Sequence, residues 1–365
     1  MKTTDKIEQK KRFPALLLKW NREQNDRQMP WKGEKDPYKI WLSEIILQQT
    51  RVEQGLSYYN NFIKTFPDIQ QLAKAKDEKI FKLWEGLGYY SRCRNLIASA
   101  RFIANERKGE FPASYEEIKT LKGVGPYTAA AISSFAFNLP HAVVDGNVFR
   151  VLARVFGIDK PTDSTEGKKY FTQLAEELLD NKQPGLYNQA IMDFGAVVCK
   201  PASPLCASCC FKKICTAFQD NRVSELPVKE KKIKIRKRWF YYLVLDFKNE
   251  IAIRQRTEKD IWQDLYEFPL IESSIELDKK TLLQQIEKQK LFNSKEVELI
   301  SVSPLFKQQL SHQLIAGQFI KFKLKRKSPG SESWQWVPKD KIGKYAFPQF
   351  INQYLKEKAG RQSLF

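Results

Sequence analysis

The chain has 365 residues, a formal net charge of +20 at pH 7 and a hydrophobic fraction of 42%, which is typical of a globular protein with two or three domains. The excess of Lys and Arg predicts a polyanionic partner, either nucleic acid or an anionic membrane. The membrane is disfavoured because no apolar run approaches the ~20 residues of a span, and since the first residues lack a signal-peptide layout we expect a cytoplasmic protein.

The first 218 residues have a pattern typical of a mostly helical region. We expect helices over residues 14–24, 37–49, 52–66, 77–84, 91–108, 128–137, 148–156 and 184–198. Ser114 and Glu117 predict a capping box for one further helix that leads to Lys122.

A Gly-x-Gly turn, Gly123-Val124-Gly125, stands directly before one of these helices. Both glycines can adopt positive φ without a Cβ penalty, and Pro126 suits the first helical position. Such a turn would present free backbone N–H groups at the positive end of a helix, which is a phosphate site. The alternative is an ordinary helix–turn–helix, because short glycine motifs are weak signals.

Two carboxylates are candidates for chemistry. Glu44 lies in the apolar run 40–47, where desolvation would raise its pKa as a general acid requires. Asp145 follows a chain break at 138–140 and precedes a helix that we expect Asn147 to cap. The alternatives are a surface glutamate at the edge of an amphipathic helix and an aspartate that serves as a second cap.

Four of the six cysteines follow the spacing C-x6-C-x2-C-x5-C, namely Cys199, Cys206, Cys209 and Cys215. Four thiolates in one loop can hold a [4Fe–4S] cluster or a zinc ion, and the spacing alone leaves both open. Cys93 and Cys210 fall outside this spacing, so we expect neither to be a ligand. In a cytoplasmic protein, cysteines are more often ligands or free thiols than disulfides.

The composition changes after residue 218. Residues 219–237 contain a basic run that predicts a linker able to touch phosphate. We then expect strands over 239–247 and 250–256 around a Lys248-Asn249 hairpin, a helix near 279–290, and further strands within 297–306, 314–325 and 333–339. These elements predict an α+β domain of roughly 125 residues, a normal domain size.

Several of these segments resemble one family. The run LKGVGPYTAAA from Leu121 resembles the helix-hairpin-helix of the endonuclease III superfamily of DNA glycosylases, and VVDGNVFRVLAR resembles its catalytic-aspartate segment. More narrowly, the chain resembles MutY-type adenine DNA glycosylases from about residue 13 almost to its end. The resemblance implies a multidomain protein, with an all-α helix-hairpin-helix glycosylase domain that carries an iron–sulfur loop, followed by an α+β MutT-like (Nudix-fold) domain.

The same resemblance implies domain limits. We expect a helical glycosylase domain over 1–218, a basic linker over 219–237 and a MutT-like lesion-recognition domain over 238–360. Within the first domain, about 31–138 would form a six-helix module with the hairpin, and 1–30 with 139–218 the iron–sulfur module. The C-terminal domain lacks the Glu-rich signature of nucleotide hydrolases, so we do not expect nucleotide hydrolysis.

The resemblance further implies a monofunctional enzyme of base excision repair, which excises adenine opposite 8-oxoguanine or guanine in duplex DNA. In this family pattern Glu44, within SEIILQQTRV, protonates adenine and positions water, and Asp145 stabilises the sugar cation or bonds C1′. Asn147 would orient a water or carboxylate, and Tyr127 would assist at the sugar. Lyases of the superfamily carry lysine at the Tyr127 position, and tyrosine cannot form a Schiff base.

The resemblance also implies DNA contacts and a cofactor. The residues expected to touch DNA are Gly123, Val124, Gly125, Gln49, Tyr89, Trp31, Ser311 and His312. Ser311 and His312 belong to the loop that senses 8-oxoguanine, in which Leu310 replaces an aromatic residue of the family. The resemblance assigns one [4Fe–4S] cluster to the four spaced cysteines, and it implies a nucleoid-associated, bacterial-type monomer.

Two alternatives stay open from the sequence. One is an endonuclease III-like glycosylase and lyase that acts on oxidised pyrimidines, against which Tyr127 and the C-terminal domain argue. The other is a non-catalytic DNA-binding protein, against which the presence of both Glu44 and Asp145 argues. The reaction product distinguishes the adenine glycosylase from these two alternatives. It would be free adenine for the adenine glycosylase, a nicked strand for the lyase and neither for a DNA-binding protein.

Overall fold

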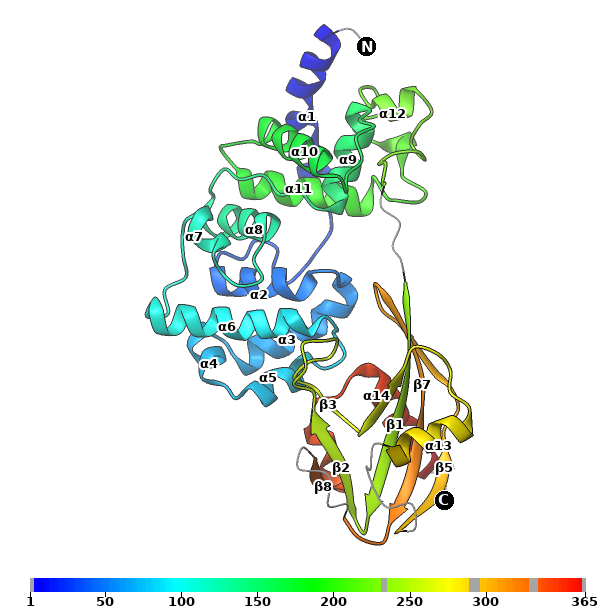
Figure 1. Ribbon diagram of the computed structural model, residues 1–365. Coiled ribbons are helices and arrows are strands. Elements are labelled where there is room, and N and C mark those ends of the chain that lie inside the picture. Colours follow the sequence, from blue (N-terminus) through cyan, green and yellow to red (C-terminus); the bar gives the residue numbers. More distant parts are fainter. Residues whose placement is uncertain (1–2, 231–234, 289–295, 328–333, 363–365) are drawn as a thin grey trace. The chain divides into compact units, whose positions relative to one another are not determined.

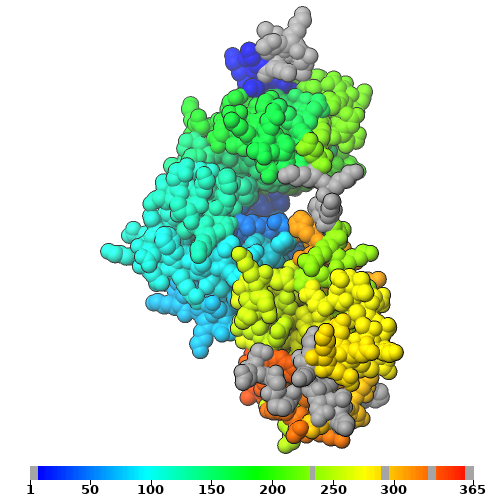
Figure 2. All heavy atoms as spheres, viewed as in Figure 1, coloured from blue at the N-terminus to red at the C-terminus, as the bar shows by residue number. Residues whose placement is uncertain are grey.

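The computed structural model describes residues 3–230, 235–288, 296–327 and 334–362, which are coloured by sequence position in Figures 1 and 2. The chain forms two compact units, of which the first is Met1–Lys74 with Asn95–Lys232 and the second is Ala75–Arg94 with Ile233–Phe365. Within the described ranges, every helix is too short or too polar to cross a membrane.

The first unit is helical, as predicted, and local caps set several of its helix ends. Its helices are α1 (Thr3–Glu23), α2 (Pro37–Leu47), α3 (Val52–Thr65), α4 (Ile69–Lys74), most of α6 (Tyr90–Glu106), α7 (Tyr115–Lys119), α8 (Pro126–Phe137), α9 (Gly146–Phe156), α10 (Thr165–Leu178), α11 (Pro184–Val197) and α12 (Thr216–Gln219), with a 3-10 turn at Cys206–Ser208. Asp36 accepts the N–H of Tyr38 at the start of α2. The predicted capping box is confirmed, because Ser114 Oγ accepts from Glu117 N at 3.3 Å and donates to Glu117 Oε2 at 2.9 Å.

Four helices of this unit differ from the sequence-based expectation, one of them the short α12, which was not expected. Helix α1 begins at Thr3, well before residue 14, and it contains Pro14. The preceding turns are held by tertiary contacts, since Gln9 Nε2 donates to the backbone oxygens of Val155 at 2.8 Å and Ile214 at 2.6 Å. Helices α4 and α10 were not expected, and α10 is anchored by its fully buried Phe171. Long-range packing, which a local pattern does not contain, stabilises these segments.

Two glycines of α11 let it approach its neighbours closely. A Cβ on Gly185 would lie 2.7 Å from the backbone oxygen of Ser134, so a larger residue would push α11 away from α8. A Cβ on Gly195 would lie 2.6 Å from the Cβ of Asn147, at the start of α9. Helices α8, α9 and α11 therefore meet at close range (Figure 1), and residues from all three line the pocket described below.

The second unit contains a mixed sheet, in agreement with the predicted α+β domain. Its elements are α5 (Asp77–Trp84), β1 (Arg236–Phe247), β2 (Glu250–Gln255), β3 (Tyr266–Glu267), β4 (Leu270–Ser273), α13 (Lys279–Lys288), β5 (Val297–Val302), β6 (Phe306–Gln309), β7 (Gln313–Leu324), β8 (Gln335–Pro338), a 3-10 turn η3 (Lys339–Lys344) and α14 (Gln349–Gln362). The strand order is β3-β2-β1-β7-β5, with β4 on β1, β6 on β7 and β8 on β2. The predicted hairpin is confirmed, because Phe247 pairs with Glu250 around Lys248-Asn249.

Helices cover both faces of this sheet (Figure 1). Tyr241 of β1 lies in one apolar cluster with Leu282 and Ile286 of α13. The next residue, Tyr242, points to the other face, where its ring centroid lies 6.2 Å from that of Phe350 of α14. Successive side chains of β1 therefore pack into apolar clusters on opposite faces of the sheet, which explains why this strand is apolar at almost every position.

The remaining differences lie in the second half of the chain. The region 297–306 contains the strand β5 and the first residue of β6 rather than one strand, and α14, β3 and β4 were not expected. Residues 231–234 of the expected linker, 289–290 of the expected helix and 333 of the expected last strand lie outside the described residues.

Helix α5 and the loop after it belong to the second unit. Lys82 Nζ donates to the backbone oxygen of Tyr345 at 3.1 Å, and Glu85 Oε1 accepts the N–H of Phe347 at 2.8 Å. These bonds join residues more than 260 positions apart in sequence and hold the loop that carries Tyr89 against the C-terminal part of the chain.

Candidate active site

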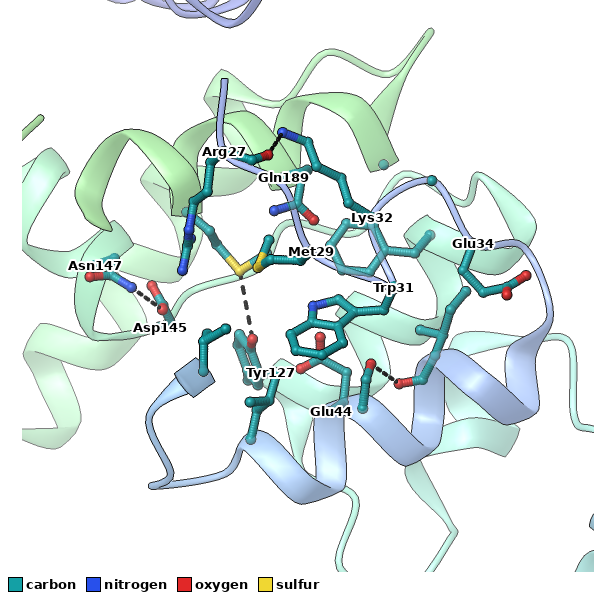
Figure 3. Close-up of a pocket in the computed structure, with 18 of the residues that line it drawn as sticks. Arg27, Met29, Trp31, Lys32, Glu34, Glu44, Tyr127, Asp145, Asn147 and Gln189 are labelled. Carbon is teal, nitrogen blue, oxygen red and sulfur yellow. Dashed lines mark hydrogen bonds between the residues drawn. The ribbon is translucent and has the colours of Figure 1, made fainter. Parts of the chain in front are cut away.

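A pocket of about 820 Å³ opens in the first unit between α2, α8, the start of α9, α11 and the loop of residues 27–35 (Figure 3). Six residues singled out from the sequence line it, namely Trp31, Glu44, Gln49, Tyr127, Asp145 and Asn147. They come from four separate segments of the chain, namely the loop of residues 27–35, α2 with its C-terminal end, α8 and the start of α9. The fold therefore brings the expected catalytic residues into one cavity.

Glu44 lies on α2 at the floor of this pocket and is 7% exposed. Burial raises its pKa from 4.5 to about 7, and the nearby Asp145 carboxylate adds to the rise, whereas a hydrogen bond with Tyr127 opposes it. Within the described part of the chain, no ion pair compensates Glu44. The group is therefore poised to hold or release a proton near neutral pH.

Asp145 is the N-cap of α9, and this corrects the expectation that Asn147 caps the helix. Asp145 Oδ1 accepts the N–H of Val148 at 2.8 Å, and Oδ2 accepts from Asn147 Nδ2 at 2.8 Å. Asn147 lies inside the first turn, and its Oδ1 accepts from Arg150 Nη2 at 2.8 Å. Burial raises the pKa of Asp145, and the hydrogen bonds from Val148 and Asn147 oppose this rise. The carboxylate is thus fixed in orientation at a positive helix end.

Tyr127 stands at the second position of α8 and points into the pocket (Figure 3). Its hydroxyl is shared between two neighbours, since it bonds to Glu44 and donates to Met192 Sδ at 3.6 Å. Burial raises the pKa of Tyr127 far above its ordinary value, and the carboxylates of Glu44 and Asp145 raise it further. The phenol therefore stays protonated and acts as a hydrogen-bond donor.

The pocket wall opposite Glu44 is held in place by a buried carboxylate, Asp193, which the sequence analysis did not single out. Asp193 is fully buried, and it pairs with Arg27 Nη1 at 2.8 Å and with Lys32 Nζ at 3.2 Å. Gln189 Nε2 also donates to Asp193, at 3.0 Å. Arg27, Lys32 and Gln189 all line the pocket. The signal available for Asp193 was the one used for Glu44, a carboxylate in an apolar helical run, whereas nothing local marks the other three.

Trp31 belongs to the same wall. Its ring meets that of Tyr59 edge-on, with 5.3 Å between centroids. Lys32 additionally donates to the backbone oxygen of Arg27 at 2.7 Å, which closes a tight loop around the tryptophan. The indole is therefore held by packing and offers an apolar surface above Glu44 and Tyr127 (Figure 3).

The Gly-x-Gly turn has one glycine in the left-handed region. Gly123 has φ of 79°, and a Cβ there would lie 2.8 Å from the Cβ of Asn95. Gly125 is the N-cap of α8 with φ of −94° and ψ of −179°. It is therefore extended, and it does not use the positive φ that the sequence allowed. Val124 between them is buried, and Pro126 occupies the first turn of α8 as predicted. The turn therefore leads directly into the helix that carries Tyr127.

The other residues expected to contact DNA divide between the units. Gln49 has φ of 56°, is exposed, and lines the Glu44 pocket at the end of α2. Tyr89, with φ of 48°, lies in the second unit, where its hydroxyl hydrogen-bonds to that of Ser311. Tyr89, Ser311 and His312 line a second pocket of about 520 Å³ within that unit. Positive φ at Gln49 and Tyr89 is uncommon for non-glycine residues and is often associated with functional sites.

The four spaced cysteines lie between α11 and α12, and all are free thiols. Burial raises the pKa of Cys215 to about 12, and Cys209, Cys199 and Cys206 add to this rise, so the four sulfurs share one environment. Arg154 Nη1 donates to Cys199 Sγ at 3.6 Å. Where the structure describes the chain, no group of three or more His, Cys, Asp or Glu side chains is arranged to hold a metal ion. The donor chemistry nevertheless suits an iron–sulfur cluster or zinc.

Comparisons with known proteins agree with this architecture. Residues 42–179 match the family of HhH-GPD superfamily base excision DNA repair proteins, and residues 240–357 match the NUDIX domain. Among solved structures, a thermostable thymine-DNA glycosylase is 30% identical with a TM-score of 0.55, and the similarity covers 59% of this chain and 99% of that one. Endonuclease III in a non-covalent DNA complex has a TM-score of 0.51 at 19% identity, covering 60% of this chain and 99% of that one, which supports the fold alone.

The fold and the matched domains therefore define a base excision DNA repair protein with an HhH-GPD domain and a Nudix-like C-terminal domain. The adenine DNA glycosylase of Buchnera aphidicola subsp. Baizongia pistaciae is 36% identical over 305 residues, covering 82% of this chain and 83% of that protein. That of subsp. Schizaphis graminum is 35% identical, covering 72% and 76% respectively. The chain belongs to the adenine DNA glycosylase family.

Proposed function

We propose that the protein is a monofunctional glycosylase that removes adenine paired with 8-oxoguanine, or with guanine, from duplex DNA. The observation that carries this proposal is one pocket in which Glu44, with a pKa near 7, faces Asp145 and lies beside a tyrosine rather than an amine. The relatives named above support adenine as the base. The net charge of +20 supports duplex DNA as the partner.

The chemistry requires a proton for the departing base and a negative charge near the sugar. In the proposed mechanism Glu44 donates its proton to adenine, so that the base leaves as a neutral molecule. Asp145 remains ionised at the helix end and stabilises the positive charge that develops on the sugar, or bonds C1′ transiently. Asn147 orients that carboxylate through its 2.8 Å hydrogen bond. Glu44, now deprotonated, then accepts a proton from the attacking water.

Adenine itself is recognised by the opposite wall in this proposal. Gln189 Nε2 donates a hydrogen bond to Asp193, which orients the side-chain amide of Gln189. The Gln189 side-chain oxygen can then accept a hydrogen bond from the exocyclic amino group of adenine. Guanine carries a carbonyl oxygen at that position and would be repelled. Trp31 supplies the apolar surface against which the extruded base packs.

The proposal of a monofunctional enzyme is supported by the state of the lysine amines in the pocket, since strand cleavage would need a free amine to attack the sugar. Two lysines line the pocket, and both are engaged, because Lys32 pairs with Asp193 and Lys35 Nζ donates to the backbone oxygen of Phe135 at 2.9 Å. Tyr127 cannot form a Schiff base. We therefore expect an abasic site as the product and no strand cleavage.

The second unit would read the opposite base. Ser311 carries a hydroxyl that can bond to N7–H or O8 of 8-oxoguanine, and Tyr89 already touches that hydroxyl. His312 lies beside it, and Gln49 would contact the orphan base from the first unit. Leu310 lacks an aromatic ring, so we expect the loop to recognise the lesion by hydrogen bonds more than by stacking.

We assign one [4Fe–4S] cluster to Cys199, Cys206, Cys209 and Cys215. The four free thiols share one environment, and Arg154 donates toward Cys199, as expected for a group that carries thiolate charge. Such a cluster would fix a loop that carries Lys200, Lys212 and Lys213 and so present them to the phosphate backbone. We further propose that the enzyme acts as a monomer in the cytoplasm, on the nucleoid.

The decisive experiment uses end-labelled duplexes with adenine opposite 8-oxoguanine, analysed with and without alkali. We expect strand breaks only after alkali, and no breaks with Glu44→Gln. Breaks without alkali would show that an amine acts and would contradict the monofunctional proposal. Retained binding with no base release would favour a DNA-binding protein, and cleavage at oxidised pyrimidines would favour the endonuclease III-like alternative.

A further inference from the structure

The distribution of methionine in this chain is uneven. The sequence contains three methionines, Met1, Met29 and Met192. Apart from the first residue, both line the Glu44 pocket, one from the loop of residues 27–35 and one from α11. Each is only partly buried, so part of each residue remains exposed. Figure 3 shows Met29 directed into the space above Tyr127.

Met192 is distinguished from Met29 by its contact with the catalytic set. Its sulfur lies 3.6 Å from the Tyr127 hydroxyl and accepts that hydroxyl's hydrogen bond. The same hydroxyl bonds to Glu44. A phenol has only one proton to donate, so the sulfur and the carboxylate compete for it. A thioether is a weak acceptor, so the reduced Met192 competes only weakly with the carboxylate for this proton.

We propose that Met192 is a reversible oxidation site that controls the position of the Tyr127 hydroxyl and thereby the rate of base release. The inference rests on the proposed glycosylase function. The oxidant is a hydroperoxide such as hydrogen peroxide. A sulfur lone pair attacks the peroxide, the O–O bond breaks, one oxygen is bonded to sulfur as the sulfoxide and the other leaves as water, so sulfur is oxidised by two electrons and peroxide is reduced.

The sulfoxide changes the competition for the Tyr127 proton. Its oxygen is a strong acceptor, and it is bonded to a sulfur that lies 3.6 Å from the Tyr127 hydroxyl. Tyr127 then donates to the sulfoxide, and Glu44 loses the bond that orients its carboxyl group. The added polar oxygen also occupies the wall beside the extruded base. Met192 is thus a positioning residue that acts through Tyr127, and its oxidation lowers the rate of base release.

A change in the pH dependence of base release accompanies the lower rate. The hydrogen bond from Tyr127 favours the charged form of Glu44, so its loss shifts the alkaline limb of the profile to higher pH. The other charged groups that line the same pocket keep their places, namely Arg27, Lys32, Glu34, Lys35 and Asp145. Loss of structure would lower the rate without moving this limb.

The test treats the whole protein with hydrogen peroxide and measures single-turnover release of adenine from a duplex with adenine opposite 8-oxoguanine. The wild-type protein is compared with Met192→Leu and with Met29→Leu, both of which conserve volume. Peptide mass spectrometry locates each sulfoxide. For each protein the ratio of treated to untreated rate is the readout, so differences in basal rate do not matter.

We expect oxidation to lower the single-turnover rate of the wild type and of Met29→Leu by at least about tenfold, and to leave the Met192→Leu ratio near one. Methionine sulfoxide reductases should restore the rate and the original pH limb, which separates this effect from damage to thiols or to a metal cluster. The same loss in Met192→Leu, or an unchanged rate with the sulfoxide confirmed at residue 192, would overturn the inference. An untreated enzyme that releases no adenine would overturn the proposed function instead.

Discussion

The two units of this protein each bury a glutamate, and they treat its charge in opposite ways. Glu44 of the first unit is 7% exposed and has no ion-pair partner among the described residues. Glu267 of the second unit is 0% exposed, and it receives Arg254 Nη2 at 2.8 Å, Arg256 Nη1 at 2.6 Å and the hydroxyl of Tyr242 at 3.2 Å.

The two glutamates differ because one has positively charged partners and the other does not. Burial disfavours the charged form, and the second unit offsets that cost with two guanidinium groups, which also join β2, β3 and the loop between them. In the first unit no ion pair among the described residues offsets the desolvation of the Glu44 carboxylate, and its pKa is therefore raised to about 7. A carboxylate that is buried but not neutralised is therefore the better marker of chemistry than burial alone.

Asp193 shows that this distinction also operates within the first unit. It is as buried as Glu267 and is likewise paired, with Arg27 and Lys32. It shapes the pocket wall, while Glu44 a short distance along the same cavity stays uncompensated. Three measurements test whether paired and unpaired carboxylates behave differently in this protein, and a fourth concerns a loop of the second unit.

The largest expected effect is on catalysis by Glu44. Glu44→Gln should lower the rate of adenine release by about 10⁴-fold, near the upper end for loss of a general acid and equal to about 5.5 kcal/mol. Single-turnover kinetics on a duplex with adenine opposite 8-oxoguanine measures it. Glu258→Gln, which alters an exposed glutamate of the second unit, is the matched control and should leave the rate unchanged. A loss below tenfold for Glu44→Gln would assign the proton to another group.

The second effect is on the stability of the second unit. Glu267→Gln should reduce its free energy of unfolding by about 3 kcal/mol, because the buried Arg256 and the partly buried Arg254 lose their buried carboxylate partner. Hydrogen exchange of the β1 and β2 amides in the whole protein reports this loss. The folded protein should retain its rate of base release from a duplex with adenine opposite guanine. Unchanged exchange would mean that these arginines are not held by Glu267.

The third effect is a dependence of stability on pH that Glu44 alone should produce. Its pKa is about 7 in the folded chain and near 4.5 when unfolded, so the folded state binds the proton more tightly. This contribution is fully present below pH 4.5 and is lost as pH rises to 7, by at most about 3 kcal/mol. Calorimetry should therefore show Glu44→Gln gaining stability over the wild type between pH 5 and pH 8. A constant difference across that range would contradict the raised pKa.

The smallest expected effect concerns the lesion-sensing loop of the second unit. Ser311→Ala removes one hydrogen bond to the oxidised base, so the preference for 8-oxoguanine over guanine should fall by about fivefold to tenfold, or about 1 kcal/mol. The ratio of kcat/KM for the two duplexes measures it. Ser301→Ala, at an exposed position of β5, serves as the control. An unchanged ratio would remove Ser311 from lesion recognition.

Much of this protein was readable from local sequence. Most helices of the first unit, the capping box at Ser114 and the hairpin at Lys248-Asn249 follow from spacing and turn chemistry, and the structure confirms them. The candidate residues Glu44, Asp145 and Tyr127 were also named from the sequence, Glu44 partly because a carboxylate in an apolar run is a local signal, and the catalytic roles of all three because their segments resemble those of a known family. Their meeting in one pocket was not visible, since it depends on how α2, α8 and α9 pack.

Other features became visible in the folded structure. Asp145 rather than Asn147 caps α9, because Asp145 Oδ1 accepts the N–H of Val148. The tertiary structure extended α1 through Pro14, formed α10 and α14, and brought Arg27, Gln189 and Met192 into the pocket. It also distinguished the uncompensated Glu44 from the paired Asp193 and Glu267. Local sequence determines which residues can be buried or charged, but the neighbours that neutralise a buried charge come from distant segments, and only packing brings them together.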